Sequence, residues 1–220
     1  MLPREITPRS VSVRGTWQAR RVTLTADDLD LAVTAVSAGL RPATGADWTV
    51  PAGTLDWDCW HTAEHIGDCL LSYAGQLVAQ PDGRYVRFLA KADEAASAAE
   101  VLEFAEVGGR ILVATLRSAP ATMRAYHPSG MADPTGFAGM GCVETLLHGE
   151  DIAQGLGVVL DPPRDLCQRV LDRMFPHVQT EDLDLWDALR WYTGRLRIVD
   201  RPAPAQWRWT SVAMDISPGS

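Results

Sequence analysis

The sequence predicts a mainly α-helical protein whose principal unit is an antiparallel bundle of four helices. Apolar residues recur at helical spacing in four long segments, at about 25–40, 57–80, 93–118 and 137–156. Loops of mixed length join these segments, and no alternation of strand and helix patterns is visible, which disfavours a Rossmann-type sheet. With 220 residues, 46% of them hydrophobic, the chain is long enough to bury a core without disulfide or metal staples.

The boundaries of the helices follow from local signals. Thr25 and Asp28 match a capping box at the start of the first helix, which Gly39 and Pro42 end. The second helix stops at Pro81. The third helix contains two consecutive glycines, at 108–109, which permit a kink or a close helix crossing. A long loop is expected over 120–136. One face of the second helix is apolar and is formed by Ala63, Ile66, Leu70, Tyr73, Ala74 and Leu77.

The sequence divides into three regions. Residues 1–22 form an irregular lead-in, in which a short strand is compatible with 11–17, and residues 23–160 form the helical bundle. Residues 161–220 form a small α/β or irregular appendage. Two short helices, at about 164–175 and 185–192, and two alternating stretches, at 195–199 and 206–210, are expected in it.

Composition limits the classes of partner. The formal net charge is −8, and nucleic-acid binders need clustered cations, so we expect no nucleic-acid partner. No apolar stretch has the length of a signal peptide or a membrane span, so a cytoplasmic protein without a membrane partner is expected. The four cysteines show no CxxC pair and are interpreted as core residues or idle thiols in a reducing cytosol. Monomer and homodimer both remain open.

Polar residues that share a stripe on two of the predicted helices are the main candidates for a functional site. On the second helix these residues are His61, His65, Asp68 and Ser72, and on the fourth they are Glu144, His148 and Asp151. Both stripes adjoin apolar residues, so we expect them to face the interior. Polar groups placed there must be paired, solvated in a cavity or bound to a metal.

The residues His65, Glu144 and His148 suit a divalent first-row metal, with zinc preferred and nickel, iron or manganese as alternatives. Three protein ligands leave one position open for water or substrate, which is typical of a catalytic site. The competing interpretation is that Glu144 and His148 form an ordinary pair four residues apart, while His65 is a hydrogen-bonded core residue. Spacing alone leaves both interpretations open.

Several short motifs resemble one protein family. The residues 55–57 (Leu-Asp-Trp) followed by 65–67 (His-Ile-Gly) resemble the second-helix signature of the DinB/YfiT-like superfamily, and more narrowly of its mycothiol-dependent maleylpyruvate isomerase family. The segment 144–151, which reads ETLLHGED, resembles that family's second ligand segment, and 191–195, which reads WYTGR, resembles a recurrent C-terminal feature. The resemblance spans about 25–195, so a DinB-like four-helix bundle is expected.

This resemblance implies a metal-dependent isomerase or transferase. In such an enzyme the metal binds the thiol of a small cofactor such as mycothiol, and the thiolate adds to or isomerises a small electrophilic substrate. Mycothiol belongs to GC-rich actinobacteria, and the 19 arginines against the single lysine, Lys91, fit such a genome. Without a thiol, the same open metal could activate water for hydrolysis.

Supporting roles are assigned to neighbouring residues. Asp151 is expected to orient His148 by a hydrogen bond to the ring nitrogen that does not bind the metal. The alternative is that Asp151 is a solvated surface acid. Arg195 is a candidate for holding a substrate carboxylate, or for a structural role after the helix-ending glycine. Trp57 and Trp60 are candidates for lining the cofactor pocket, or for core packing.

The remaining charged and imidazole groups are assigned to the surface. Asp68 is interpreted as a surface charge, and His127 and His177 as solvated loop residues.

Two other functions remain open. The residues 61–65 match HxxEH, the inverzincin peptidase pattern, in which His61 and His65 would bind zinc and Glu64 would activate water. That peptidase core is a mixed α/β domain, and this reading leaves His148 unexplained, although His61 could still act as an auxiliary ligand or proton carrier beside the metal. A metal-binding or ligand-binding protein without turnover is the third function.

Overall fold

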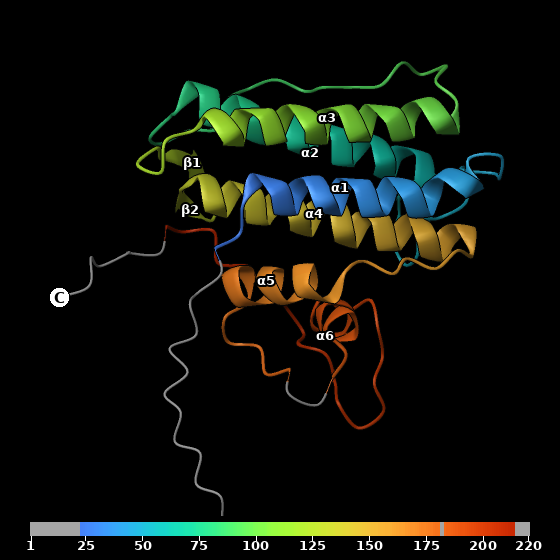
Figure 1. Ribbon diagram of the computed structural model, residues 1–220. Coiled ribbons are helices and arrows are strands. Elements are labelled where there is room, and N and C mark those ends of the chain that lie inside the picture. Colours follow the sequence, from blue (N-terminus) through green and yellow to red (C-terminus); the bar gives the residue numbers. More distant parts are fainter. Residues whose placement is uncertain (1–22, 181–182, 214–220) are drawn as a thin grey trace, which may run out of the picture.

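The computed structural model describes residues 23–180 and 183–213 and confirms a mainly α-helical fold. Four long helices run alongside one another (Figure 1): α1 (Ala26–Leu40), α2 (Cys59–Ala79), α3 (Ala98–Ser118) and α4 (Pro134–Leu156). Helix α2 packs against α3 and α4, and α1 packs against the same two helices. The short 3-10 helix η1 (Arg41–Ala43) continues α1. This packing sets the inner faces of α2 and α4 against each other.

Capping side chains explain where the helices begin. The predicted capping box at Thr25 and Asp28 is confirmed at the start of α1. Ser97 and Glu100 form a second capping box, so α3 begins at Ala98, later than the expected start near 93. The Asp58 side chain accepts a hydrogen bond from the backbone N–H of His61 at the start of α2, which fixes the first turn of the helix that carries His65.

The predicted apolar face of α2 is buried, and the glycine pair of α3 allows a close crossing with α2. Leu70 and Leu77 are fully buried. A Cβ atom at Gly108 would lie 2.9 Å from the backbone oxygen of Gly67, so the two backbones approach within the space that a side chain would need. Helix α3 continues across 108–109, and the close crossing, one of the two alternatives expected there, is confirmed.

The long loop expected over 120–136 is wrong in part. It contains a two-stranded antiparallel hairpin of β1 (Ala125–His127) and β2 (Gly130–Ala132), with Ala125 opposite Ala132. Helix α4 also begins earlier than expected, at Pro134, because Asp133 caps it by accepting a 2.7 Å hydrogen bond from the Gly136 N–H.

The C-terminal region contains α5 (Arg164–Met174) and α6 (Leu185–Tyr192), as expected, and α5 packs on α4 and α1. The alternating stretches at 195–199 and 206–210 form no strands, and the segment after α6 is irregular, which is the second of the two alternatives expected for this region.

A fully buried arginine fixes the end of this irregular segment. Arg173 of α5 donates hydrogen bonds to the carbonyl groups of Thr210 and Val212 and pairs with Asp133 at 3.3 Å. The last described residues are therefore fastened to the start of α4.

The lead-in at 1–22, with its suggested strand at 11–17, lies outside the described residues. Within 23–180 and 183–213, no helix has both the length and the apolar character that crossing a membrane requires.

We expect Gly108→Ala to destabilise the protein by about 1 kcal/mol or more. Alanine gains about 1 kcal/mol in helix propensity over glycine, but the added Cβ meets backbone that has no room to move, and overpacking typically costs about 1–3 kcal/mol. Urea denaturation would measure the change in unfolding free energy. The control is Gly45→Ala, where the new Cβ meets nothing within 4 Å. A stabilised Gly108→Ala protein would show that the crossing is not tight.

Candidate metal centre

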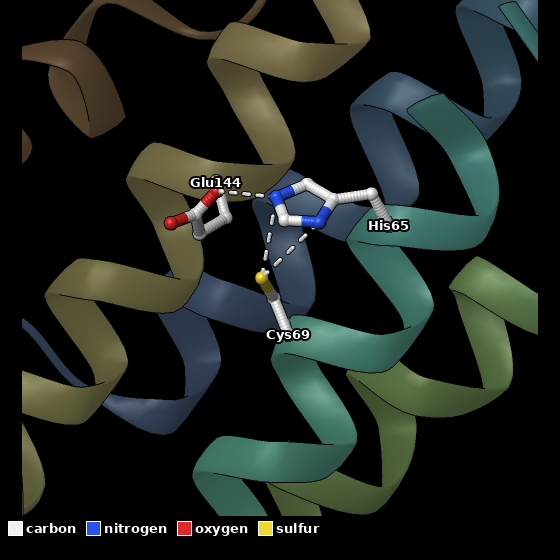
Figure 2. A group of neighbouring side chains, drawn as sticks. All are labelled: His65, Cys69 and Glu144. Atoms are coloured by element: carbon white, nitrogen blue, oxygen red, sulfur yellow. Dashed lines mark hydrogen bonds and ion pairs between the residues drawn. The ribbon is translucent and has the colours of Figure 1, made fainter. Parts of the chain in front are cut away.

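The polar stripes of α2 and α4 meet at one point between the two helices. His65 and Cys69 lie one turn apart on α2, and Glu144 and His148 lie one turn apart on α4. Figure 2 shows the His65 ring beside both the Glu144 carboxylate and the Cys69 thiol, with a dashed line to each. The Oε2 atom of Glu144 is 3.2 Å from Nε2 of His148 and 3.9 Å from Nε2 of His65. The three residues predicted from the stripes are thus brought together.

Two of the separations between donor atoms are close to those of a metal site, and the third is slightly longer. Bond lengths of about 2.0–2.3 Å in a tetrahedral zinc site place neighbouring ligand atoms roughly 3.3–3.6 Å apart. The observed contacts are 3.2 Å between Glu144 and His148, 3.4 Å between Cys69 Sγ and His65 Nε2, and 3.9 Å between His65 and Glu144. The donor set of imidazole, carboxylate and thiol also suits a divalent first-row ion. The group of His65, Cys69 and Glu144 therefore fits such an ion, and His148 contacts this group through Glu144.

Groups behind the centre hold the side chains in orientation. Tyr73 donates a 3.2 Å hydrogen bond to the second oxygen, Oε1, of Glu144. The Asp151 carboxylate lies 3.1 Å from Nδ1 of His148, so the other ring nitrogen, Nε2, is turned toward Glu144. Histidine ligands of metals are commonly oriented by a carboxylate in this way. Asp151 is almost fully buried, as expected for a group that acts from behind.

Arg195 completes this arrangement from the C-terminal region. Its Nε and Nη2 atoms donate to the two oxygens of Asp151 at 2.9 and 2.7 Å, and Nε also approaches the Leu147 carbonyl. The guanidinium fork is therefore directed at Asp151, and this geometry favours positioning of Asp151 over contact with a substrate carboxylate.

The surroundings of the centre favour a neutral His65, a protonated His148 and an ionised Glu144. Burial, together with the neighbouring His148, lowers the pKa of His65 and favours its neutral form. Burial also opposes protonation of His148, but its hydrogen bonds with Asp151 and Glu144 prevail and raise its pKa to about 9. Burial opposes ionisation of Glu144, yet the contact with His148 keeps its pKa below the ordinary value. A protonated His148 is thus the alternative to a metal ion as the counter-charge of Glu144.

A pocket of about 440 Å³ opens beside His65, between the first turns of α2 and the segment 89–91. Trp57 and His61 line it, as does Lys91. Its other polar walls are carboxylates, contributed by Asp56, Asp58, Glu64 and Asp68. The Glu64 and Asp68 carboxylates accept hydrogen bonds from the backbone N–H groups of Ala92 and Ala90, so α2 itself holds the opposite wall in place.

Of the other residues predicted for the site, Trp57 contacts His65, whereas Trp60 and His61 have partners outside the centre. The Trp57 ring packs edge-on against His65 at 4.8 Å, whereas Trp60 is turned away and donates to the Ala96 carbonyl. His61 is mostly exposed and bonds to Asp58 through Nδ1. In the described residues, the donor atoms that all lie within 4.8 Å of one another belong to His65, Cys69 and Glu144, so neither His61 nor His148 is part of this group. His148 differs from His61 in that its Nε2 contacts Glu144 directly, at 3.2 Å.

The two loop histidines, expected to be solvated, both have partners. His127 is half-buried, with Nδ1 2.5 Å from the hydroxyl of Ser129. His177 is exposed, but its Nε2 lies 2.5 Å from the Tyr192 hydroxyl.

Cys69 was not among the site residues predicted from the sequence. Cys59, Cys142 and Cys167 are buried, as expected for core residues, but Cys69 is half-buried within the centre. Burial raises the pKa of the Cys69 thiol and favours its protonated form. The signal that could have found it is its spacing of four residues from His65, the same spacing that links Glu144 and His148.

Comparisons with family models, curated proteins and solved structures found no match to this chain.

We expect Arg195→Met to destabilise the protein by roughly 3 kcal/mol, because removing one partner of a buried ion pair is costly and the Asp151 carboxylate keeps only its contact with His148. The side chains of Arg195 and Asp151 are 11% and 3% exposed. Chemical denaturation would measure the loss. The matched control is Arg117→Met, whose ion pair with Asp27 is exposed and should leave stability unchanged. Equal effects of the two substitutions would contradict a special role for the Arg195 contact.

Proposed function

We propose that this protein is a divalent-metal-dependent enzyme with the antiparallel four-helix bundle of DinB-like proteins, and that His65, Glu144 and His148 bind the metal. Zinc is the preferred ion. The observation that carries the proposal is that Nε2 of both histidines approaches one oxygen of Glu144. In addition, Tyr73 hydrogen-bonds to the other oxygen of Glu144, and Asp151 hydrogen-bonds to the other ring nitrogen of His148. A chance polar pair on α4 would account for neither the position of His65 nor the orientation of His148.

The chemistry that such a metal supplies is activation of a coordinated thiol or water, whose proton it makes easier to lose. The chain's own residues prepare the site for this. Asp151 fixes His148 with Nε2 toward the metal position, and Arg195 holds Asp151. Tyr73 donates a hydrogen bond to Oε1 of Glu144, so that Oε2 is the oxygen directed at the two imidazoles.

The pocket beside His65 is the proposed place for the substrate and for a small thiol cofactor such as mycothiol. Trp57 offers an apolar face next to His65, and His61 stands at the exposed side as a candidate proton carrier. Four carboxylates against the one lysine make the walls negative. A neutral or cationic electrophile therefore suits this pocket better than a dianion, because like charges repel in a confined space. Reaction with a cytosolic thiol would make the protein a thiol-dependent isomerase or transferase.

Hydrolysis by metal-activated water is the second candidate function, and the HxxEH motif at 61–65 is its most specific form. The structure weighs against the peptidase form, since His61 is bonded to Asp58 and Glu64 to the backbone of Ala92. The mainly helical fold also differs from the mixed α/β core in which that motif works. A binding protein without turnover would use the same metal site.

Elemental analysis of the purified protein should find about one divalent metal ion per chain, and His148→Ala should lose most of it because a direct ligand is removed. His61→Ala is the matched control on α2 and should keep its metal. Circular dichroism would establish that both variants are folded. Retention of metal by His148→Ala together with loss from His61→Ala would reject this site in favour of the peptidase motif.

Mycothiol should raise the melting temperature of the zinc-loaded protein but not of the metal-stripped protein, because a ligand that binds only the native state stabilises it by mass action. At a thiol concentration of about 100 times the dissociation constant, the stabilisation is about 2.7 kcal/mol. S-methylated mycothiol, which cannot form a thiolate, is the control ligand. Equal shifts with and without metal would contradict the thiol mechanism and favour water activation.

A further inference from the structure

Cys69 points into the proposed metal centre from the same face of α2 as His65 (Figure 2). Its sulfur is 3.4 Å from Nε2 of His65, the nitrogen that also faces Glu144. The ligand atoms of His65, Cys69 and Glu144 all lie within 4.8 Å of one another. The thiol therefore belongs to the same group of donor atoms as His65 and Glu144, whereas His148 lies outside that group and contacts it through Glu144.

Two helical pairs surround that point. Residues four apart on a helix lie one above the other on the same face, so α2 presents an imidazole and a thiol, and α4 presents a carboxylate and an imidazole. His65 and Cys69 occupy the α2 positions, while Glu144 and His148 occupy the α4 positions. Since α2 packs directly against α4, the four donors come from two facing pairs.

We propose that Cys69 is the fourth protein ligand of the metal held by His65, Glu144 and His148. The inference rests on the proposed metal site but not on any reaction there. Coordination breaks the S–H bond of Cys69, releases its proton to solvent and forms a bond from sulfur to the metal. A thiolate also makes the donor set softer, which favours zinc over magnesium, calcium or manganese.

Four protein ligands give a closed site, whereas three leave a position open. With Cys69 bound, a small thiol or a water molecule has to compete with an internal thiolate for its place. Cys69 therefore regulates access to the centre and provides the protein with its own sulfur ligand at the position that the external thiol needs.

Cobalt spectroscopy tests this assignment without relying on activity, because a thiolate bound to Co²⁺ gives an intense charge-transfer band in the near ultraviolet that imidazole and carboxylate ligands do not give. The Co²⁺-loaded wild-type protein should show this band, and Cys69→Ser should lose it while still binding cobalt. Cys167→Ser removes a buried thiol on α5 and is the matched control, which should keep the band. Cys69→Ala excludes a contribution from the introduced hydroxyl.

Zinc affinity provides the second measurement. Loss of an outer-shell partner typically weakens metal binding by about 10–100-fold, so loss of a direct ligand in Cys69→Ser should cost at least about tenfold, against no change in Cys167→Ser. A wild-type protein that binds cobalt without the band, or a Cys69→Ser protein with unchanged spectrum and affinity, would overturn the assignment and leave the three-ligand site intact. A wild-type protein that binds neither cobalt nor zinc would overturn the metal site itself.

Discussion

The carboxylate of Glu144 is the group on which the rest of the centre depends. Its side chain is only 12% exposed, and a charge removed from water to this extent must be compensated by partners that stay in place. His148 and Tyr73 bond directly to it, and His65 approaches from α2. The next groups in the chain of contacts are also charged and buried. His148 hydrogen-bonds to the buried Asp151, and Asp151 forms a salt bridge with Arg195. One buried charge thus organises α2, α4 and the segment after α6.

The structural interpretation and the metal interpretation of the centre differ in what supplies its positive charge. The position between Glu144 and the two imidazoles requires positive charge, and either a proton on His148 or a divalent ion supplies it. A proton makes the cluster a structural ion-pair network, whereas a metal ion makes it a reactive centre beside a pocket. Cys69 sharpens this distinction, since a neutral thiol contributes little to a proton-balanced network but is a strong donor to zinc.

The sequence was informative where a structure is set by residues close together in the chain. The capping box at Thr25, the apolar face of α2 and the stripe that holds Glu144 and His148 are all local patterns, and they predicted the helices and their inner faces. The irregular course of 195–213 depends on tertiary contacts that no local pattern encodes, such as the hydrogen bond from Arg173 to the Thr210 carbonyl. The hairpin at 125–132 is local, but its three-residue strands are too short to give an alternating pattern. The pairing of Arg195 with Asp151 joins residues 44 positions apart, and Cys69 was overlooked because one thiol without a second cysteine nearby matches no metal motif.

The contact between Arg195 and Asp151 also has a consequence for biosynthesis. Arg195 leaves the ribosome 44 residues after Asp151, which at about 5–20 residues per second corresponds to roughly two to nine seconds. During that interval α4 is complete, but its buried aspartate has no arginine. The C-terminal segment is therefore the last part of the centre to be synthesised. A recombinant chimera that exchanged everything after residue 160 would leave Asp151 with its His148 contact but without an arginine, unless the new tail brought one to the same place.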